Sequence, residues 1–248
     1  MEGIPVGEAA LLLGGGLVAG VVNTLAGGGS LLTVPLLVML GLPGGVANGT
    51  NRVGILLQCL AAAWQFRSLG VLRGRDVLPI VAPVAFGSVL GAVLVGQIAN
   101  ATFERIFGVV MLLLLVPTLR GVHTTARAVS RPHPVVTALA LLVIGIYTGA
   151  FQAGVGILLL FALLYLGHDA MHANALKVTV IALSALSAVP VFAWNEQIAW
   201  IPALVLAAGF TVGGALGAKF AVRGGERLIR PVLAVAVVAL ALRMLTIG

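Results

Sequence analysis

The stretch TLAGGGSLLTVP, Thr24 to Pro35, places three consecutive glycines between two strongly apolar runs. A glycine inside a helix costs about 1 kcal/mol relative to alanine. Three together therefore predict a break in any helix that contains them. Such a break is typical either of a phosphate-binding loop or of a turn inside a membrane domain.

The composition of the whole chain favours the membrane. Of its 248 residues, 60% are hydrophobic and only 8% are charged, whereas about a quarter of a soluble chain is charged. Apolar runs recur from end to end, which predicts a multi-pass protein of the lipid bilayer with no sizeable soluble domain. The sequence GGGS also lacks the Lys-Ser/Thr pair of a phosphate loop, so we expect no nucleotide site.

The formal charge of +7 does not indicate nucleic-acid binding, because the basic residues fall in a few short loops, as orientation in a membrane requires. The N-terminus has no basic region typical of a cleaved signal peptide. The single cysteine, Cys59, excludes a disulfide within the chain and is expected to be a small core residue. We expect no cofactor and no resident metal.

Two apolar segments are too short to cross a bilayer as helices. The apolar segments lie at 6–25, 30–41, 45–66, 77–98, 103–119, 133–152, 156–167, 170–192, 197–220 and 228–246. A crossing needs about 20 residues, whereas 30–41 and 156–167 rise only ~18 Å each. Whether these two span or re-enter the membrane stays open at this point.

A shift of 126 residues aligns the two halves of the chain. MLGLPGGVANGTNR (39–52) then meets YLGHDAMHANALKV (165–178), and GSVLGA (87–92) meets GGALGA (213–218). The identities are few, but they keep register through a whole half. This agreement predicts an internal duplication.

Loop charges predict that the two repeats have opposite orientations. RSLGVLRGRD (67–76) is basic and therefore cytoplasmic, whereas its counterpart WNEQIAW (194–200) contains no Lys or Arg and suits the outside. We predict a first transmembrane repeat at 1–120, a cytoplasmic linker at 121–132 and a second, inverted repeat at 133–248, with both termini outside. The expected fold is an all-α membrane protein of two inverted-topology repeats, each of about four to five helical segments with Gly-rich broken or re-entrant hairpins, a pattern typical of secondary transporters.

The glycines at 27–29 are interpreted as the turn of one hairpin and FQAGVG (151–156) as the turn of the other. Glycine permits such turns and lets a backbone or a ligand approach closely. The half-helix that follows, starting at Ser30 or Gly156, would direct free N–H groups at an anion lying between the two tips. The alternative interpretation is close helix packing by small residues.

Polar side chains follow the same register in two segments: Asn48, Asn51, Gln58 and Gln65 in the first half, and Asn174, Lys177, Ser184 and Ser187 in the second. Polar residues in membrane helices line a water-filled path or bond neighbouring helices, and both alternatives remain.

Arg52 and Lys177 each lie about two turns inside a segment, and no acidic residue in the same segment pairs with them. A buried cation costs a few kcal/mol, which an anionic substrate would offset; the alternative is snorkelling to the interface. No carboxylate lies deep in any segment, which argues against a carboxylate-based cation or proton relay.

The sequence HDAMH contains His168 and His172 four residues apart, with Asp169 at an expected helix start. The two histidines alone are a weak metal pattern, and Asp169 is more simply a helix N-cap. Protonation of His172 is a further alternative, as a gating switch.

The motif GGG, followed by an apolar run into Pro35, Leu40-Gly41 and A-x-G-T-N at 47–51, resembles the TauE/SafE family of sulfite exporters along the whole chain. The second half departs from it, with QAGVG for the glycine run and ANALK for A-x-G-T. The resemblance implies transport of small sulfur-containing anions such as sulfite, sulfonates, sulfoacetate or thiosulfate, without fixing the direction.

The leading hypothesis is a secondary transporter in the cytoplasmic membrane that works by alternating access; a small-anion channel and a non-transporting subunit are the alternatives. No nucleophile–base pair or metal cluster for an enzyme is evident. Proton or ion coupling and a homodimer are left open. The candidate substrate-binding residues are Gly27, Gly28, Gly29, Ser30, Asn48, Thr50, Asn51, Arg52, Gln152, Gly154, Gly156, Asn174 and Lys177.

Overall fold

The computed structural model describes residues 4–72, 77–120, 133–222, 238 and 240–241. These residues form helices and turns, with no strand among them, and the all-α prediction is confirmed. The helices are α1 (Val6–Ala26), α2 (Ser30–Met39), α3 (Gly44–Ser68), α4 (Leu78–Val95), α5 (Asn100–Arg120), α6 (Pro134–Ala150), α7 (Val155–Tyr165), α8 (Ala170–Trp194) and α9 (Trp200–Val222).

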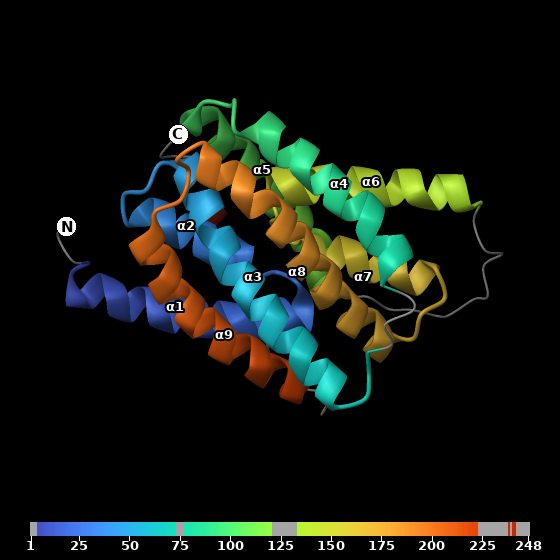
Figure 1. Cartoon of the computed structure of the whole chain (residues 1–248). Helices are drawn as coiled ribbons and strands as arrows, with labels where there is room; N and C mark the ends of the chain where they lie inside the picture. Colours follow the sequence, from blue (N-terminus) through green and yellow to red (C-terminus); the bar gives the residue numbers. More distant parts are fainter. Residues whose placement is uncertain (1–3, 73–76, 121–132, 223–237, 239, 242–248) are drawn as a thin grey trace.

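Two helices, α2 and α7, are only half as long as a membrane is thick. They have 10 and 11 residues, a rise of roughly 15 Å each against the ~30 Å of a hydrocarbon core. Each forms a hairpin with the longer helix before it, α2 with α1 and α7 with α6 (Figure 1). The short segments expected near 30–41 and 156–167 are therefore half-length helices, and neither can cross a bilayer alone.

Four helices, α1, α4, α8 and α9, are long and apolar enough within the described ranges to cross a membrane. α3 has 25 residues but carries a series of buried polar side chains. The predicted linker, 121–132, and nearly all of the last predicted segment, 228–246, lie outside the described residues.

The helices α3 and α8 lie side by side in the middle of the molecule (Figure 1). Around this pair, α9 packs on α1 and α3, while α4 packs on α6 and α8. The long arm of each hairpin therefore packs on a helix from the other half of the chain.

Glycines let these outer helices approach backbone to backbone. A Cβ atom at Gly87 of α4 would lie 2.8 Å from the backbone nitrogen of Ile146 on α6, and one at Gly217 of α9 would lie 3.1 Å from the backbone of Val21 on α1. Larger residues would force the helices apart. The motifs GSVLGA and GGALGA, which the 126-residue shift aligned, thus pack against the long arms of opposite hairpins.

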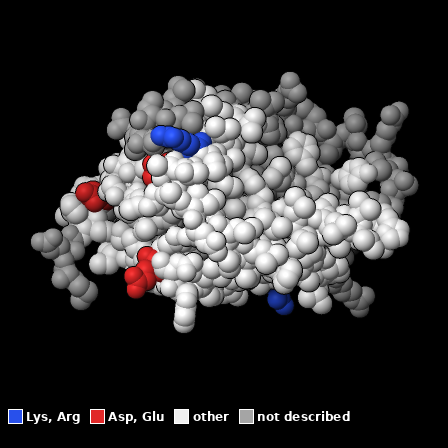
Figure 2. Space-filling model, turned by 90° about the horizontal axis from the view of Figure 1, so that it is seen from above, with Lys and Arg blue, Asp and Glu red and all other residues white. Residues whose placement is uncertain are grey.

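Charged side chains are few on the face shown in Figure 2, and they lie near its edges. The described carboxylates stand near the starts of helices or just beyond their ends: Glu8, Glu104, Asp169 and Glu196. In the described ranges, the middle of every helix is therefore free of acidic residues.

Candidate functional site

The tips of the two hairpins touch near the middle of the molecule (Figure 1). A Cβ atom at Gly27 would lie 2.6 Å from the Cα atom of Gly156, so no larger residue fits there. Gly27 ends α1 with a φ of 76°, and Gly154 precedes α7 with a φ of 60°, both in the left-handed region that glycine adopts without strain. In this conformation the backbones of Gly27 and Gly156 are in contact, and the anion site between the two tips stays a prediction.

The first tip, the turn at 27–29, is held by a network of buried amides. Asn23 donates from Nδ2 to Oε1 of Gln58 at 2.6 Å, and Gln58 donates from Nε2 to Oγ1 of Thr24 at 2.7 Å. The backbone N–H of Gly29 donates to Oδ1 of Asn23 at 3.3 Å. Both side-chain amides of this network therefore donate and accept, and the backbone of Gly29 is bonded to it.

The start of α2 is tied to α3 in the same way. Asn51 donates from Nδ2 to Oγ of Ser30 at 3.1 Å, and its Oδ1 accepts from Oγ1 of Thr33 at 2.6 Å. All three side chains are buried. Two predicted site residues, Ser30 and Asn51, thus form a structural bond between α2 and α3.

Lys177 of α8 caps the C-terminal end of α1. Its Nζ donates to the carbonyl oxygen of Thr24 at 3.0 Å and to that of Asn23 at 3.5 Å. The carbonyl of Asn23 also accepts from the backbone N–H of Gly27 at 2.9 Å, whereas that of Thr24 lies among the last carbonyls of α1, which a helix leaves without an intrahelical donor. The cation also matches the partial negative charge at a helix C-terminus.

Arg52 of α3 caps the C-terminal end of α6 in the same way. Its guanidinium donates to the carbonyl oxygens of Thr148, at 3.0 Å, and of Gly149, and it lies 4.5 Å from the ring centroid of Phe192. Asn48, one turn earlier on α3, donates from Nδ2 to the carbonyl of Ala150 at 2.8 Å. Each half of the chain therefore supplies the cation that caps the hairpin of the other half.

These caps correct the sequence-based view of the two cations. Arg52 and Lys177 are fully buried at 0% exposure, so neither snorkels to an interface. Their partners include backbone carbonyls at helix ends, which have no sequence signature. These carbonyls carry only partial charges, so by themselves they do not balance a full positive charge.

The second tip, the turn at 151–154, differs from the first in its hydrogen bonds. Among the described residues, four buried side-chain atoms near it have no hydrogen-bond partner. We call these the open atoms: Oδ1 of Asn48, Nε of Arg52, and Oε1 and Nε2 of Gln152. Gln152 is 3% exposed and has a φ of 56°, a conformation that costs a non-glycine residue roughly 1–2 kcal/mol.

Two other predicted site residues, Thr50 and Asn174, differ in their contacts. Thr50 accepts a hydrogen bond at its Oγ1 from the backbone N–H of Ala199, 2.9 Å away, and so holds the connection before α9. Asn174 is 9% exposed, and its Oδ1 has no hydrogen-bond partner within the described part of the chain. The structure thus groups most of the predicted residues at the two tips and places Thr50 on another face of α3.

Sequence reasoning did not list Asn23, Thr24 and Thr33 among the site residues, although all three are buried and bonded at the first tip. A signal was present, because Asn23 and Thr24 are polar residues directly before the glycine run. Thr148 could not have been found, since it contributes a backbone carbonyl to Arg52.

The HDAMH sequence forms the start of α8. The Asp169 side chain accepts from the backbone N–H groups of Met171, at 3.1 Å, and His172, at 2.9 Å, as predicted for an N-cap. The hydrogen bond from His172 in particular lowers the pKa of the Asp169 carboxyl below its ordinary value. Nδ1 of His172 lies 3.0 Å from the carbonyl oxygen of Val71, beyond the end of α3. In the described ranges, no group of three or more His, Cys, Asp or Glu side chains could hold a metal ion.

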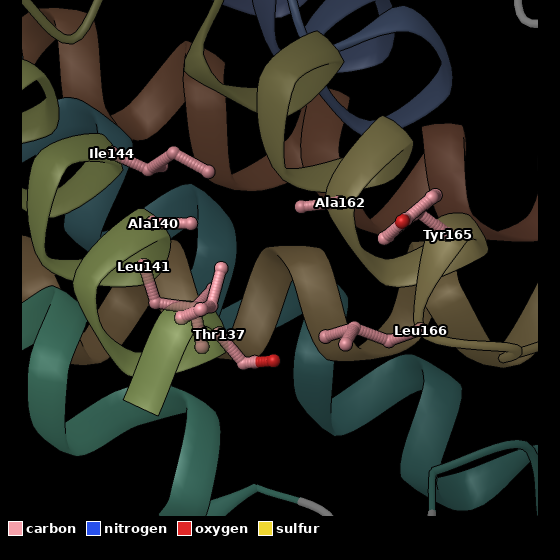
Figure 3. A pocket seen from close by; sticks show the side chains of 8 residues that line it. Thr137, Ala140, Leu141, Ile144, Ala162, Tyr165 and Leu166 are labelled. Carbon is pink, nitrogen blue, oxygen red and sulfur yellow. The ribbon is translucent and has the colours of Figure 1, made fainter. Parts of the chain in front are cut away.

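An apolar pocket of about 90 Å³ lies between the arms of the second hairpin (Figure 3). Its lining is Val136, Thr137, Ala140, Leu141, Ile144, Ala162, Tyr165 and Leu166. None of the open atoms belongs to this lining. The pocket is therefore not the candidate site, which is the polar centre at the tips.

Comparison with known proteins identifies the family. The model of the sulfite exporter TauE/SafE family matches residues 12–244. A probable membrane transporter protein of Haemophilus influenzae is 31% identical over 236 residues, covering 91% of this chain and 90% of the relative. A probable membrane transporter protein of Sinorhizobium, ORF9, is 28% identical, covering 95% of this chain and 92% of its own length. The probable membrane transporter protein YfcA of Escherichia coli K12 is 24% identical, with coverages of 92% and 86%.

No solved structure matches the chain. The family match extends over nearly the whole sequence and includes both hairpins. The chain therefore belongs to the TauE/SafE sulfite exporter family.

Proposed function

We propose that the protein is a secondary transporter that carries small sulfur-containing anions across the cytoplasmic membrane by alternating access. The observation that carries the proposal is the contact between two hairpins, each with one half-length helix, beside the buried cations Arg52 and Lys177. Irregular backbone at membrane depth is tolerated where protein or a cavity covers it. Transporters use such broken helices to build their substrate sites.

The charge at the centre favours an anion. The C-terminal ends of α1 and α6 each contribute about half a negative charge, and the N-terminal ends of α2 and α7 about half a positive charge each. These partial charges cancel, so the helix ends do not balance the full positive charges that Arg52 and Lys177 bring to the centre. The described carboxylates lie near helix ends, away from the middle of the helices.

Alternating access is supported by contacts in which each half of the chain caps a helix of the other half. Arg52 of the first half caps α6, and Lys177 of the second half caps α1. The aligned glycine motifs pack against opposite hairpins. Such crossed, equivalent contacts are what a pair of inverted repeats requires, and rocking of one repeat against the other would open the touching tips to one side at a time.

The choice of a sulfur-containing anion rests on the family, whose model is that of a sulfite exporter. The relatives from Haemophilus influenzae, Sinorhizobium and Escherichia coli are each named as probable membrane transporters. The buried cations agree with this substrate class, because sulfite and sulfonates are compact anions that accept charge-assisted hydrogen bonds.

The test is a flux assay with purified protein in proteoliposomes, using sulfite, sulfate, thiosulfate, taurine and sulfoacetate as substrates. We expect saturable flux of at least one sulfite or sulfonate anion. Flux far faster than a transporter allows, and independent of any imposed proton or ion gradient, would indicate a channel. If none of the anions is moved or raises the melting temperature of the protein, the proposed function is wrong.

A further inference from the structure

The open atoms at the second tip comprise hydrogen-bond donors and acceptors, and their roles follow from their bonds. Nδ2 of Asn48 is committed to the carbonyl of Ala150, so its Oδ1 is an acceptor. Nε of Arg52 is a donor only. The Gln152 amide offers one atom of each kind. The second tip therefore presents two donors and two acceptors.

These atoms belong to residues at one place, the C-terminal end of α6. Arg52 is fixed at the carbonyls of Thr148 and Gly149, and Asn48 is fixed at that of Ala150. Gln152 follows Ala150 by two residues. All three side chains are at least 97% buried.

Leaving such atoms without partners is costly. An unsatisfied buried polar group destabilises a protein by the full cost of removing it from water, and the left-handed backbone of Gln152 adds strain. At the first tip, by contrast, the amides of Asn23, Gln58 and Asn51 all find protein partners. Strain and open polar atoms that coincide at one tip indicate a place where a ligand completes the hydrogen bonds.

We propose that the second tip binds the polar head of the transported anion, and that this anion carries a hydrogen-bond donor of its own. This inference rests on the proposed function and specifies its substrate. The anionic oxygens accept from Nε of Arg52 and Nε2 of Gln152, while a hydroxyl, ammonium or protonated oxygen of the ligand donates to Oδ1 of Asn48 or Oε1 of Gln152.

The same chemistry disfavours an anion that has acceptors only. Such a ligand would leave Oδ1 of Asn48 unsatisfied or would face it with a second oxygen lone pair. Sites that hydrogen-bond a substrate hydroxyl reject the analogue that lacks it much more strongly than apolar pockets discriminate by size. Among sulfonates of equal charge, those that carry a hydrogen-bond donor should therefore bind more tightly.

Three ligands with one skeleton test this inference: ethanesulfonate, isethionate, which adds a hydroxyl, and taurine, which adds an ammonium group. Binding to the purified full-length protein is measured by calorimetry. Because one hydrogen bond contributes about 1 kcal/mol net and a buried unsatisfied acceptor costs more, we expect isethionate to bind at least ~10-fold more tightly than ethanesulfonate, with taurine also ahead.

Matched variants assign the effect to the second tip. Gln152→Met keeps the side-chain length and removes both amide atoms, so the preference for isethionate over ethanesulfonate should fall severalfold. Gln58→Met makes the same change at the first tip, where both amide atoms have partners, and should leave that preference unchanged. If Gln152→Met fails to fold, the ligand series on the unaltered protein still decides.

The outcomes separate this inference from the proposed function. Equal affinity for all three sulfonates, in a protein that still transports a sulfur anion, overturns the donor requirement and leaves the transporter intact. A preference for isethionate that survives Gln152→Met but disappears in Gln58→Met places the ligand at the first tip and overturns the assignment. Failure of every sulfur anion to bind or move overturns the transporter proposal itself.

Discussion

The two hairpin tips share a design but differ in how completely their hydrogen bonds are made. Both turn at a glycine with a left-handed backbone, both touch the other tip, and both end a helix whose carbonyls are capped by a cation from the other half. At the first tip the amides of Asn23, Gln58 and Asn51 all have protein partners, whereas the second tip has four open atoms and a strained Gln152. Under the proposal made above, the first tip holds the structure together and the second tip binds the ligand.

The largest expected effect comes from breaking the contact between the tips. Gly27→Ala places a Cβ atom 2.6 Å from the backbone of Gly156 and also strains a left-handed residue. Overpacking costs ~1–3 kcal/mol and the strain ~1–2 kcal/mol, so we expect about 4 kcal/mol of destabilisation in total. The melting temperature of the purified protein in detergent measures this loss.

Gly41→Ala is the matched control for that substitution. Gly41 also has a positive φ, 92°, but nothing lies within 4 Å of a Cβ atom placed on it. This variant should lose only the strain component, about 1–2 kcal/mol. Equal losses in the two variants would contradict a packed contact between the tips.

Removal of a cap should come next in size. Arg52→Met leaves the carbonyls of Thr148 and Gly149 without their donor, which should cost about 3 kcal/mol and abolish anion binding in a calorimetric titration. Lys177→Met should cost about 2 kcal/mol, mainly through the carbonyl of Thr24, and weaken anion binding less. Weaker anion binding in Lys177→Met than in Arg52→Met would contradict the placement of the anion at the second tip.

Gln152→Gly should change stability and binding in opposite directions. Glycine relieves the positive φ of Gln152 and removes two buried open atoms, so the protein should become more stable by about 1–2 kcal/mol. Anion affinity should fall, because two ligand contacts are lost. If the variant is more stable and still binds anions as tightly, Gln152 does not contact the ligand.

The smallest expected effect lies at the start of α8, the helix that carries Lys177. Asp169→Ala removes the N-cap to Met171 and His172 and should cost about 1 kcal/mol. Because the folded state lowers the pKa of the Asp169 carboxyl, its contribution is present above the unfolded pKa and is lost as the pH falls through the lowered folded value. Melting temperatures in acid should therefore converge for Asp169→Ala and the unaltered protein, while differing at neutral pH.

The sequence predicted the shape of the fold better than the bonding of its centre. The glycine run at 27–29 and the short segments near 30–41 and 156–167 predicted broken helices, because length and backbone preference are readable from residue types. The cap partners were missed, since Arg52 and Lys177 bind backbone carbonyls, which every residue possesses.

The polar stripe of α3 shows the same limit within one helix. Its periodicity placed Asn51 and Gln58 on a buried face, and both are fully buried. Gln65 instead lies near the end of α3, only partly buried and bonded to Ser68. Thr50, also predicted as a site residue, accepts from the connection before α9. Helical spacing assigns a face, but neighbouring helices decide which residues on it meet.

The caps between the two halves also determine when each hairpin can be completed during synthesis. Thr24 precedes Lys177 by 153 residues, so the first hairpin leaves the ribosome long before its cation exists. Arg52, in turn, is made 96 residues ahead of the carbonyl of Thr148 that it will hold. During membrane insertion, bare carbonyls and a lone guanidinium must therefore wait for the second half of the chain. Neither half can cap its own hairpin. A chain truncated before α8 should therefore lack the cap of α1 and be degraded as a misfolded protein.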